Sequence, residues 1–487
     1  MRACLLKIVK WTAIIATACL LTFLGVRIYD TQRGLPLELW HTYVPEEMSI
    51  ADLDRGGWGD YLKAEDAAFA GVRAEVTERL DASERVPVNR YFDGSPVYPG
   101  HFAQDWNRSY ELRPDGPPKG VAVFLHGLTD SPYSLRHIAR RYRDQGFVAV
   151  AIRLPGHGTV PGGLTDVTWE EWLAATRLAV REARQQVPAP LPLHIVGFSN
   201  GGALAMMYAM EALEDKQLAR PDRLILISPM VGITAFARFA GVAGWPAFFP
   251  AFAKAAWLSI LPEFNPFKYN SFPVNGARQS FQLTQALQAK IVRHEREDRL
   301  AGLPPVMTFQ SVLDFTVSTR AVIRALYNRL PDNGSELVLF DLNRGTKIGL
   351  LFSTRATTAV NRLLPPAPRR YGTTIVTNAG PDTGAMVARV TPAGATSEET
   401  RDLGFSYPLG VFSLSHVALP FPVSDELYGL QPDSTEEFGI QLGNIAARGE
   451  RGSLIVNLDS LLRMSSNPFY PYLLSRVEAA MAPAPAP

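Results

Sequence analysis

A strand that turns into a helix within a few residues most constrains what this chain can fold into. The stretch 193–198 is apolar and typical of a short buried strand, and the stretch 203–210 is rich in Ala, Leu and Met, which favours a helix. The sequence between them includes Gly-Phe-Ser-Asn-Gly-Gly. Glycines permit the strained angles and close packing that so sharp a bend requires. We therefore predict a strand–turn–helix unit with Ser199 at its apex.

The pattern G-x-S-x-G, formed by Gly197, Ser199 and Gly201, indicates chemistry at this bend. Such a turn lifts the serine hydroxyl beyond the end of the strand and beside the free N–H groups of a helix N-terminus. Ser199 is therefore a candidate nucleophile. An ordinary tight turn that holds a serine is the alternative, because a chain of this length contains roughly 0.2 chance matches to the pattern.

Strand and helix patterns alternate on both sides of this unit, which predicts an α/β fold. A mostly parallel sheet with helices on both faces follows from that alternation. Reactive groups in such sheets lie beyond the carboxyl ends of the strands, where we place Ser199. The expected strands are 121–126, 147–155, 193–198, 223–229, 306–314 and 336–342.

A serine nucleophile needs a base, and the base needs an acid that orients it. In this architecture the acid and then the histidine follow the serine along the chain. Of the eight histidines only His294 and His416 follow Ser199, and His294 lies in a charged helical segment that we expect to be solvated. We therefore predict His416 as the base. Asp314 directly follows an expected strand and is the predicted acid, whereas Asp341, the second choice, could face solvent.

The oxyanion that forms during attack on a carbonyl needs preorganised N–H donors. One donor should be the backbone N–H of Asn200, the residue after the nucleophile. The other should come from the loop after the first core strand, where we predict Leu128. Gly127 in the same loop allows the backbone to approach closely.

The N-terminus differs from the rest of the chain because an uncharged apolar run from Trp11 to Val26 follows the basic residues Arg2, Lys7 and Lys10. The run is slightly shorter than the ~20 residues that span a bilayer, but lysines near its end can snorkel. We predict a retained single-span membrane anchor, with a cleaved signal peptide as the alternative. The positive charges favour a cytoplasmic N-terminus and an extracytoplasmic, periplasmic catalytic domain.

Composition narrows the remaining classes. The net charge is +1 and 47% of the residues are hydrophobic, which favours an ordered globular protein and argues against a nucleic-acid binder. The only two cysteines, Cys4 and Cys19, lie in the N-terminal segment, so the chain has neither a disulfide framework nor a cysteine nucleophile beyond it. No metal-binding or phosphate-loop motif is present, so we predict no metal and no cofactor.

We predict six parts in chain order. A membrane anchor and an N-terminal extension precede the first half of the core, and a helical cap inserted in the core covers the strand ends. The second half of the core carries another insertion, and a disordered tail follows. The expected ranges are 1–33, 34–115, 116–230, 231–304, 305–480 with its insertion at 344–411, and 481–487.

Six motifs together carry a resemblance to a known family. They are VFLHGLTDSPYS, AIRLPGHGT, WEEW, GFSNGG, SVLDFTVS and FSLSHVALPF. Over 116–343 and 405–425 the chain resembles the α/β-hydrolase superfamily, and within it the group of monoglyceride lipases, lysophospholipases and carboxylesterases that is filed with serine aminopeptidases. The resemblance implies Ser199 as nucleophile, Asp314 as acid, His416 as base, and Leu128 and Asn200 as oxyanion donors. The separation of Asp314 and His416 is longer than is usual in that group.

The expected cap indicates the substrate. It is rich in aromatic residues, and Glu263 is its only acidic residue between Val231 and His294. A peptide amine would favour acidic groups near the site, whereas a fatty acyl chain favours an apolar slot. We therefore expect a membrane-anchored serine hydrolase of lipid-like or other hydrophobic esters. A serine aminopeptidase, an acyltransferase with the same triad, and a non-catalytic binding module are the alternatives, and the oligomeric state is not predicted.

Overall fold

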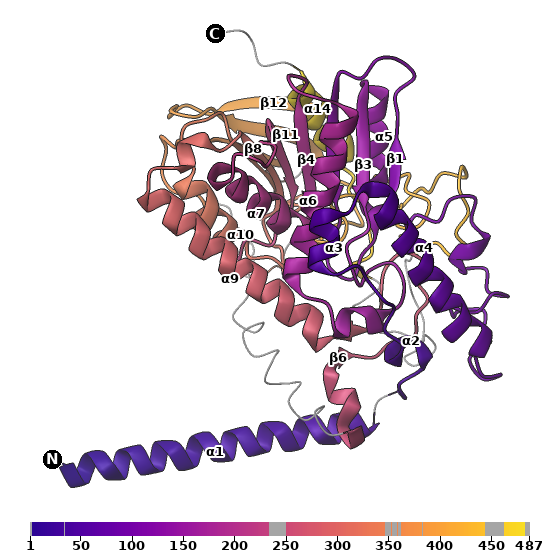
Figure 1. Ribbon diagram of the computed structural model, residues 1–487. Coiled ribbons are helices and arrows are strands. Elements are labelled where there is room, and N and C mark those ends of the chain that lie inside the picture. Colours follow the sequence, from indigo (N-terminus) through magenta and orange to yellow (C-terminus); the bar gives the residue numbers. More distant parts are fainter. Residues whose placement is uncertain are drawn as a thin grey trace.

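The structure, a computed structural model, describes residues 2–33, 35–232, 250–345, 352, 358, 362–381, 383–443 and 462–482. Within these residues one ten-stranded sheet passes through the molecule, with helices on both faces (Figure 1). A two-stranded ribbon, β6 (Trp257–Ser259) with β7 (Phe272–Pro273), lies outside that sheet.

The large sheet has the order β1-β3-β2-β4-β5-β8-β9-β10-β11-β12. Its strands β3 to β10 in that order pair in parallel, while β1, β11 and β12 are antiparallel to their neighbours. The prediction of a mostly parallel sheet is therefore confirmed. The bounds are β1 Tyr110–Leu112, β2 Gly120–Leu125, β3 Phe147–Ile152, β4 Leu193–Phe198, β5 Arg223–Ile227, β8 Val306–Ser311, β9 Glu336–Phe340, β10 Gly372–Asn378, β11 Ala385–Thr391 and β12 Glu399–Ser406.

Two hydrophobic cores lie on opposite faces of the sheet because neighbouring side chains of a strand point to opposite sides. In β2, Val121, Val123 and Leu125 enter one core, whereas Ala122 and Phe124 enter the other. Helices α3, α4, α6, α7 and α9 contribute to the first core, and helices α5 and α14 contribute to the second. The helix bounds are α3 Ile50–Arg55, α4 Trp58–Glu75, α5 Arg136–Asp144, α6 Trp169–Gln186, α7 Asn200–Glu214, α9 Val274–Arg296 and α14 Tyr470–Met481.

The segment between residues 35 and 115 packs on the sheet through α3, α4 and the edge strand β1. The side chain of Arg153, which follows β3, is fully buried and forms ion pairs with Glu65 of α4 and with Glu47. The short helix α2 (Leu39–Thr42) carries His41, whose Nε2 lies 3.0 Å from Ser271 Oγ. The N-terminal extension is thus tied to the core by buried polar contacts.

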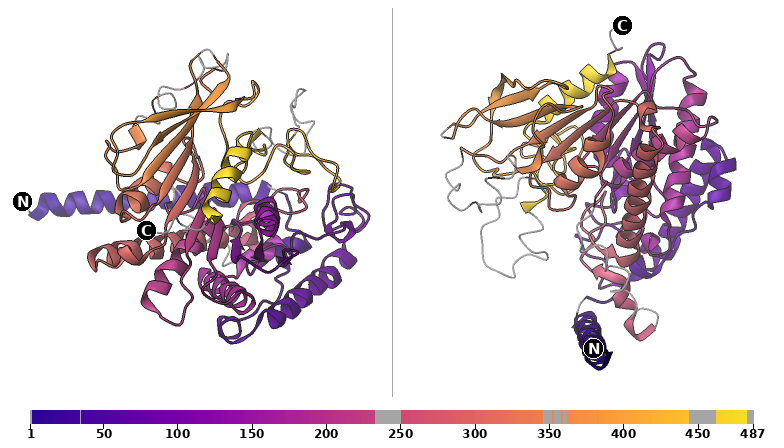
Figure 2. Two further views of the ribbon diagram at one scale, coloured as in Figure 1. Left: turned by 90° about the horizontal axis from the view of Figure 1, so that it is seen from above. Right: turned by 90° about the vertical axis from the view of Figure 1, so that its left-hand side faces the viewer.

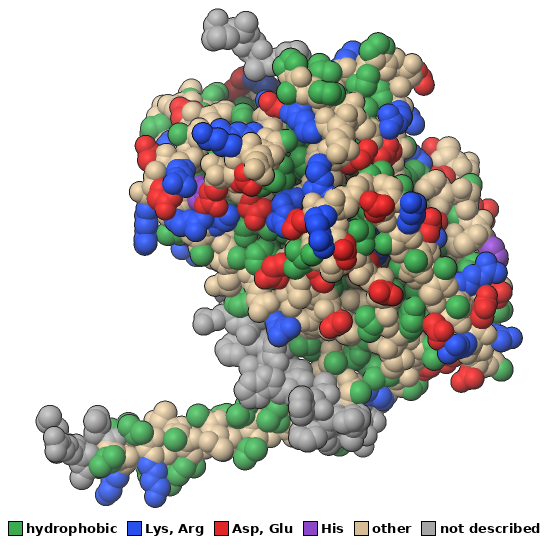
Figure 3. Space-filling model, in the orientation of Figure 1, with side chains coloured by type: hydrophobic (Ala, Val, Ile, Leu, Met, Phe, Trp, Pro, Cys, Tyr) green, Lys and Arg blue, Asp and Glu red, His purple; other side chains and the backbone are tan. Residues whose placement is uncertain are grey.

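Helix α1 (Arg2–Arg33) extends away from the rest of the molecule, and its C-terminal end contacts the 3₁₀ helix η7 (Pro250–Ala256) (Figures 1 and 2). Its stretch Leu6–Val26 is long and apolar enough to cross a membrane and is not buried against the protein. Figure 3 shows hydrophobic and uncharged side chains along most of α1, with cationic side chains near its N-terminal end. A signal sequence would have the same properties.

The segment predicted as an insertion at 344–411 supplies the strands β10, β11 and β12, which extend the large sheet beyond β9 (Figure 2). The cap predicted for 231–304 stays a prediction, because residues 233–249 lie outside the described part, and α9 packs against α7 in the helix layer. The prediction that a disordered tail includes residue 481 is wrong, since Met481 is the buried last residue of α14. Residues 483–487 lie outside the described part.

Candidate active site

Ser199 occupies the sharp turn between β4 and α7. Its backbone angles, φ 54° and ψ −113°, are unusual for a residue with a side chain and indicate a strained turn. A Cβ on Gly201 would lie 2.0 Å from the carbonyl oxygen of Leu125, and a Cβ on Gly197 would lie 2.5 Å from that of Gly201. The turn therefore requires glycine at both positions, as the sequence pattern predicts.

The N-terminus of α7 begins directly after this serine. Asn200 is the first residue of the helix, so its N–H has no acceptor within the helix and is free for a ligand. The Asn200 side chain accepts a hydrogen bond from Ser280 Oγ of α9 at 2.8 Å. Helix α9 thereby fixes the residue that we predict as an oxyanion donor.

His416 and Asp314 are in direct contact. His416 Nδ1 lies 2.8 Å from Asp314 Oδ2, and the His416 ring stacks on Phe198, with ring centroids 5.2 Å apart. Asp314 follows β8, and Ser199 follows β4. Both strands are parallel neighbours of β5, so the acid and the serine lie at the carboxyl ends of the strands. With Nδ1 donating to Asp314, the other ring nitrogen of His416 is left as a proton acceptor.

Asp314 is completely hydrogen-bonded. Its Oδ1 accepts the N–H groups of Thr316 and Val317, both at 2.8 Å, and its Oδ2 accepts Gln310 Nε2 at 3.0 Å in addition to His416. Burial on its own would raise the pKa of Asp314, but His416 and the backbone N–H groups outweigh it and hold the pKa below the ordinary value. Asp314 is therefore an anion at neutral pH.

The loop after β2 is held by a neutral histidine. The buried His126 accepts the N–H of Leu154 at Nε2 over 2.9 Å, so its Nδ1 carries the proton and donates to the Gly127 carbonyl. Burial and the neighbouring His157 hold the pKa of His126 well below its usual range. A Cβ on Gly127 would lie 3.3 Å from Ser199 Cβ, so this loop packs against the serine turn.

A cavity of about 350 Å³ lies over the serine, within the size range of ligand sites. Ser199, His416, Gly127 and Leu128 line one part of it. Its remaining walls come from the segment 259–272 and from the loops after β8 and β12, and they are mainly apolar. The predicted nucleophile, base and oxyanion loop therefore share one cavity, with Asp314 behind His416.

The two alternative candidates lie elsewhere. The expectation that His294 is solvated is wrong: its side chain is fully buried, with Nε2 2.9 Å from Glu214 Oε1. The expectation that Asp341 could face solvent is also wrong, because only 3% of the residue is exposed and its carboxylate accepts hydrogen bonds from Arg344 and Thr377. Neither residue lines the cavity.

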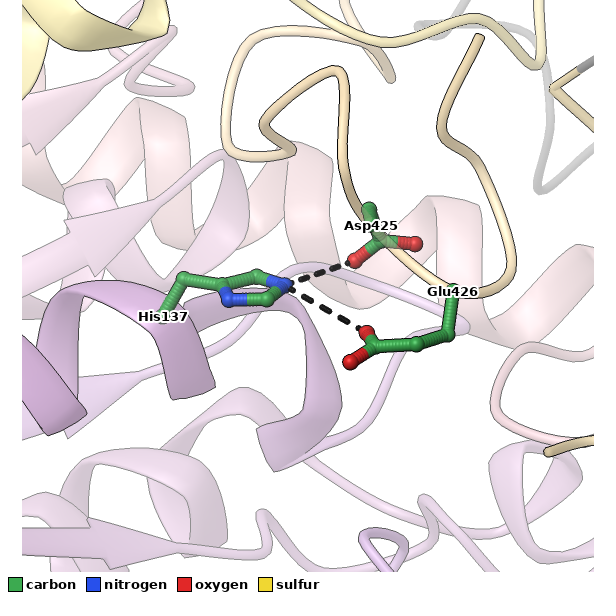
Figure 4. A group of neighbouring side chains, drawn as sticks. All are labelled: His137, Asp425 and Glu426. Atoms are coloured by element: carbon green, nitrogen blue, oxygen red, sulfur yellow. Dashed lines mark hydrogen bonds and ion pairs between the residues drawn. The ribbon is translucent and has the colours of Figure 1, made fainter. Parts of the chain in front are cut away.

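A second cluster of charged groups lies between α5 and the loop that follows His416. His137, Asp425 and Glu426 approach one another with the geometry of potential metal ligands (Figure 4). The fully buried Arg136, however, pairs with Asp425 at 2.8 Å and with Glu426 at 2.5 Å. The guanidinium already supplies the cation that these carboxylates need, so the cluster fixes the loop to α5 and does not favour a metal ion.

Sequence reasoning missed this network and two cations in the cavity, Lys268 and Arg463. The network joins residues almost 300 positions apart, and neither segment has a recognisable motif. Lys268 lies in the predicted cap, which we interpreted from its aromatic residues alone. Arg463 lies beyond any segment that we assigned to the site.

Part of this chain is similar in sequence to known proteins. A family model described as "Serine aminopeptidase, S33" matches residues 116–341. A thermostable monoacylglycerol lipase from a Bacillus species is 30% identical over 92 residues, which cover 19% of this chain and 35% of that protein. A monoacylglycerol lipase from Mycolicibacterium smegmatis is 32% identical over 98 residues, covering 20% of this chain and 34% of that protein.

The chain spans about a third of the length of these curated relatives. Among solved structures, a soluble variant of a monoglyceride lipase from Saccharomyces cerevisiae is 15% identical, covers 47% of this chain and 81% of its own, and gives a TM-score of 0.37. The part of the chain that matches the family model contains the parallel strands β2, β3, β4, β5, β8 and β9 of the large sheet. Residues 116–341 are thus similar to the serine aminopeptidase family, and further elements of this chain flank them on both sides.

Proposed function

We propose that this protein is a membrane-anchored serine hydrolase that cleaves carboxylic esters of lipid-like character. The observation that carries the proposal is the cavity in which Ser199 meets His416, itself hydrogen-bonded to Asp314. A strained serine at a helix N-terminus, a histidine with a free acceptor nitrogen and a buried carboxylate are the components of acyl transfer through an acyl-enzyme. The similarity to monoacylglycerol lipases supports the choice of an ester.

In the proposed cycle, His416 takes the proton of Ser199 as the hydroxyl attacks the ester carbonyl. The N–H groups of Leu128 and Asn200 stabilise the oxyanion, and Asp314 stabilises the protonated imidazole. The alcohol leaves with a proton from His416, and water then attacks the acyl-enzyme by the reverse use of the same groups. No residue in this cycle needs a metal or an organic cofactor.

The wall of the cavity favours an ester over a peptide. No Asp or Glu is among its lining residues in the described part of the chain, so none of these residues would pair with the amine of a peptide N-terminus. The carboxylate of Glu263, an acidic residue of the predicted cap, is buried and accepts the N–H groups of Asn270 and Ser271. An aminopeptidase is therefore the weaker alternative, and a non-catalytic role would leave the hydrogen-bonded pair of His416 and Asp314 in the cavity of Ser199 unexplained.

We also propose that α1 spans a membrane and places the domain outside the cytoplasm. Its uncharged stretch and the lysines before it support this orientation. Contact between the end of α1 and η7 brings the segment that leads into the cavity wall close to the membrane surface. Such an arrangement suits a substrate drawn from the bilayer.

Labelling with a fluorophosphonate probe tests the catalytic proposal. We expect the full-length protein in detergent to be labelled on the Ser199 peptide, as mass spectrometry would show, and the Ser199→Ala variant to lose the label. The matched control is Ser475→Ala, which changes an exposed serine of α14 and should keep the label. A folded wild-type protein that neither takes the label nor hydrolyses p-nitrophenyl esters would contradict the proposal.

A further inference from the structure

We propose that the cavity over Ser199 binds an anionic group of its ester substrate through Lys268 and Arg463, so that the natural substrate is an amphiphile with a phosphate or a carboxylate. This inference rests on the proposed function and narrows its substrate class. The two cations share one cavity with the serine and with apolar residues. Such a mixture fits a molecule with an apolar chain at one end and a negative charge at the other.

Lys268 is a cation without a partner. It is partly buried in the cavity wall, and within the described residues its ammonium forms no ion pair and no hydrogen bond. Burial lowers the pKa of Lys268, and the nearby Asp130 opposes this effect. An ammonium that loses water without gaining an acceptor carries a free-energy cost, which an anionic ligand would repay.

Arg463 lines the same cavity as Lys268, is exposed, and lies in the part of the chain just before α14. Its Nη2 donates to Thr316 Oγ1 at 2.9 Å, and its guanidinium carbon lies 5.9 Å from the centre of the Phe315 ring. No carboxylate pairs with it among the described residues. The guanidinium therefore has unused donors, and a planar fork of N–H groups suits phosphate and carboxylate oxygens.

The electrostatics of the lining are one-sided. Among the described residues that line the cavity two are cationic and none is acidic, although the whole chain is almost neutral with a net charge of +1. Asp130, behind the wall, is buried, and its Oδ2 has no hydrogen-bond partner. Burial raises the pKa of Asp130, and the charge of Lys268 opposes this effect.

Neutral hydrogen-bonding groups complete the polar end of the cavity. Asn265, Asn270 and Tyr428 line it together with Lys268. Leu261, Phe264 and Phe272 form apolar wall nearby and suit an acyl chain. A monoacylglycerol would fill the apolar part but would leave both cations unpaired, whereas an anionic ester would satisfy them.

The test compares three esters that share an oleoyl chain: 1-oleoyl lysophosphatidic acid, oleoyl lactate and neutral 1-oleoylglycerol. The full-length enzyme in non-ionic detergent should give a higher kcat/KM for an anionic ester than for the neutral one. In Lys268→Met and in Arg463→Gln we expect the ratio of anionic to neutral kcat/KM to fall about tenfold or more, mainly through KM, because each variant removes one charge-assisted contact. Lys216→Met, an exposed lysine after α7, is the control and should keep the ratio.

The outcomes separate the sources of the anion. A loss confined to lysophosphatidic acid indicates phosphate, and a loss confined to oleoyl lactate indicates carboxylate; both support the proposal. An equal loss for all three esters, or an unchanged ratio in both variants, would overturn it and leave the esterase proposal intact.

A binding measurement covers the case in which no ester is turned over. Ser199→Ala protein should bind ether-linked 1-O-oleyl-glycerol phosphate more tightly than 1-O-oleylglycerol, and the added Lys268→Met change should remove the preference. If the protein showed neither turnover nor fluorophosphonate labelling but still preferred the phosphate ether, the esterase proposal would be contradicted and the anion site would stand. Equal binding of the two ethers would contradict the anion site.

Discussion

His416 Nδ1 lies 2.8 Å from Asp314 Oδ2 although 102 residues separate the two side chains. Strand β9 and the three strands that extend the sheet all lie within that interval. The chain leaves the site after β8, adds strands at one side of the sheet and returns with the histidine. A large addition between acid and base is thus accommodated at the edge of the sheet, where it does not disturb their contact.

Asp314→Asn tests this contact directly. The amide keeps the size of the side chain but can no longer stabilise a protonated His416 or impose its tautomer, so we expect kcat to fall by about 10⁴-fold with the fold intact. Steady-state hydrolysis of a p-nitrophenyl ester measures this. Asp341→Asn, at the end of the adjacent strand, is the control and should retain most of its turnover. Equal losses of kcat in the two variants would contradict the assignment of Asp314 as the acid.

The same variant should change stability in acid. The pKa of Asp314 is lower in the folded state than in the unfolded chain, so its contribution to the free energy of unfolding is present above about pH 4 and is lost as the pH falls through the folded value. Asp314→Asn lacks this contribution. We expect urea unfolding curves of wild type and variant to differ more at pH 7 than at the lowest pH where both fold. A constant difference across pH would contradict the assignment.

Gly201→Ala should damage the serine turn. The new Cβ would lie 2.0 Å from the Leu125 carbonyl oxygen and 2.6 Å from that of His126, and neither is a flexible side-chain atom. We expect a loss of about 1–3 kcal/mol in the free energy of unfolding, with loss of fluorophosphonate labelling. Gly59→Ala is the control, because a Cβ there meets nothing within 4 Å and lies in helix α4. That change should be neutral or slightly stabilising.

Arg136→Met should strongly destabilise the protein. It removes the guanidinium from Asp425 and Glu426, which are almost fully buried, and leaves two carboxylates without their cation. Breaking such a pair costs about 3–5 kcal/mol, which chemical unfolding can measure. Arg143→Met in the same helix α5 removes only an exposed pair with Asp144 and should cost less than about 1 kcal/mol. Similar losses would show that the buried network contributes little.

Membrane fractionation tests the role of α1. The full-length protein should remain in the membrane pellet after alkaline carbonate extraction, and a charged substitution such as Leu20→Arg in the apolar stretch should weaken its retention. Protease added to intact spheroplasts should digest the domain if it lies outside the cytoplasm. Recovery of a soluble protein that lacks its first residues would instead identify a cleaved signal sequence.

Local patterns predicted the parts of this molecule that have a sequence period or a motif. The buried strands β2, β3, β4, β5, β8 and β9 lack alternation because both of their faces are covered, and the glycines around Ser199 follow from the steric demands of one turn. The expected chain order of serine, acid and histidine identified Ser199, Asp314 and His416, whose side chains lie at one end of the sheet. Strand β12 was missed because its charged, mostly exposed residues do not resemble a buried strand.

Contacts between distant segments could not be predicted. His294 lies in a segment rich in charged residues, which suggested exposure, but Glu214 from α7 accepts its hydrogen bond and allows its burial. Lys268 and Arg463 come from segments almost 200 residues apart, and only the folded chain brings them to one cavity. The lining of this cavity thus comes partly from loops whose positions the sequence does not reveal.

The added strands β10, β11 and β12 also decide where the sheet ends. Strand β9 is largely buried, and if it were the last strand it would be an exposed apolar edge strand that could pair with other chains. Strand β12 instead carries Glu399, Arg401 and Asp402 on an exposed border, and charges of both signs there discourage association between copies. The segment 372–406 consequently protects the edge of the sheet from aggregation. We expect a shortened chain that ended its sheet at β9 to be less soluble.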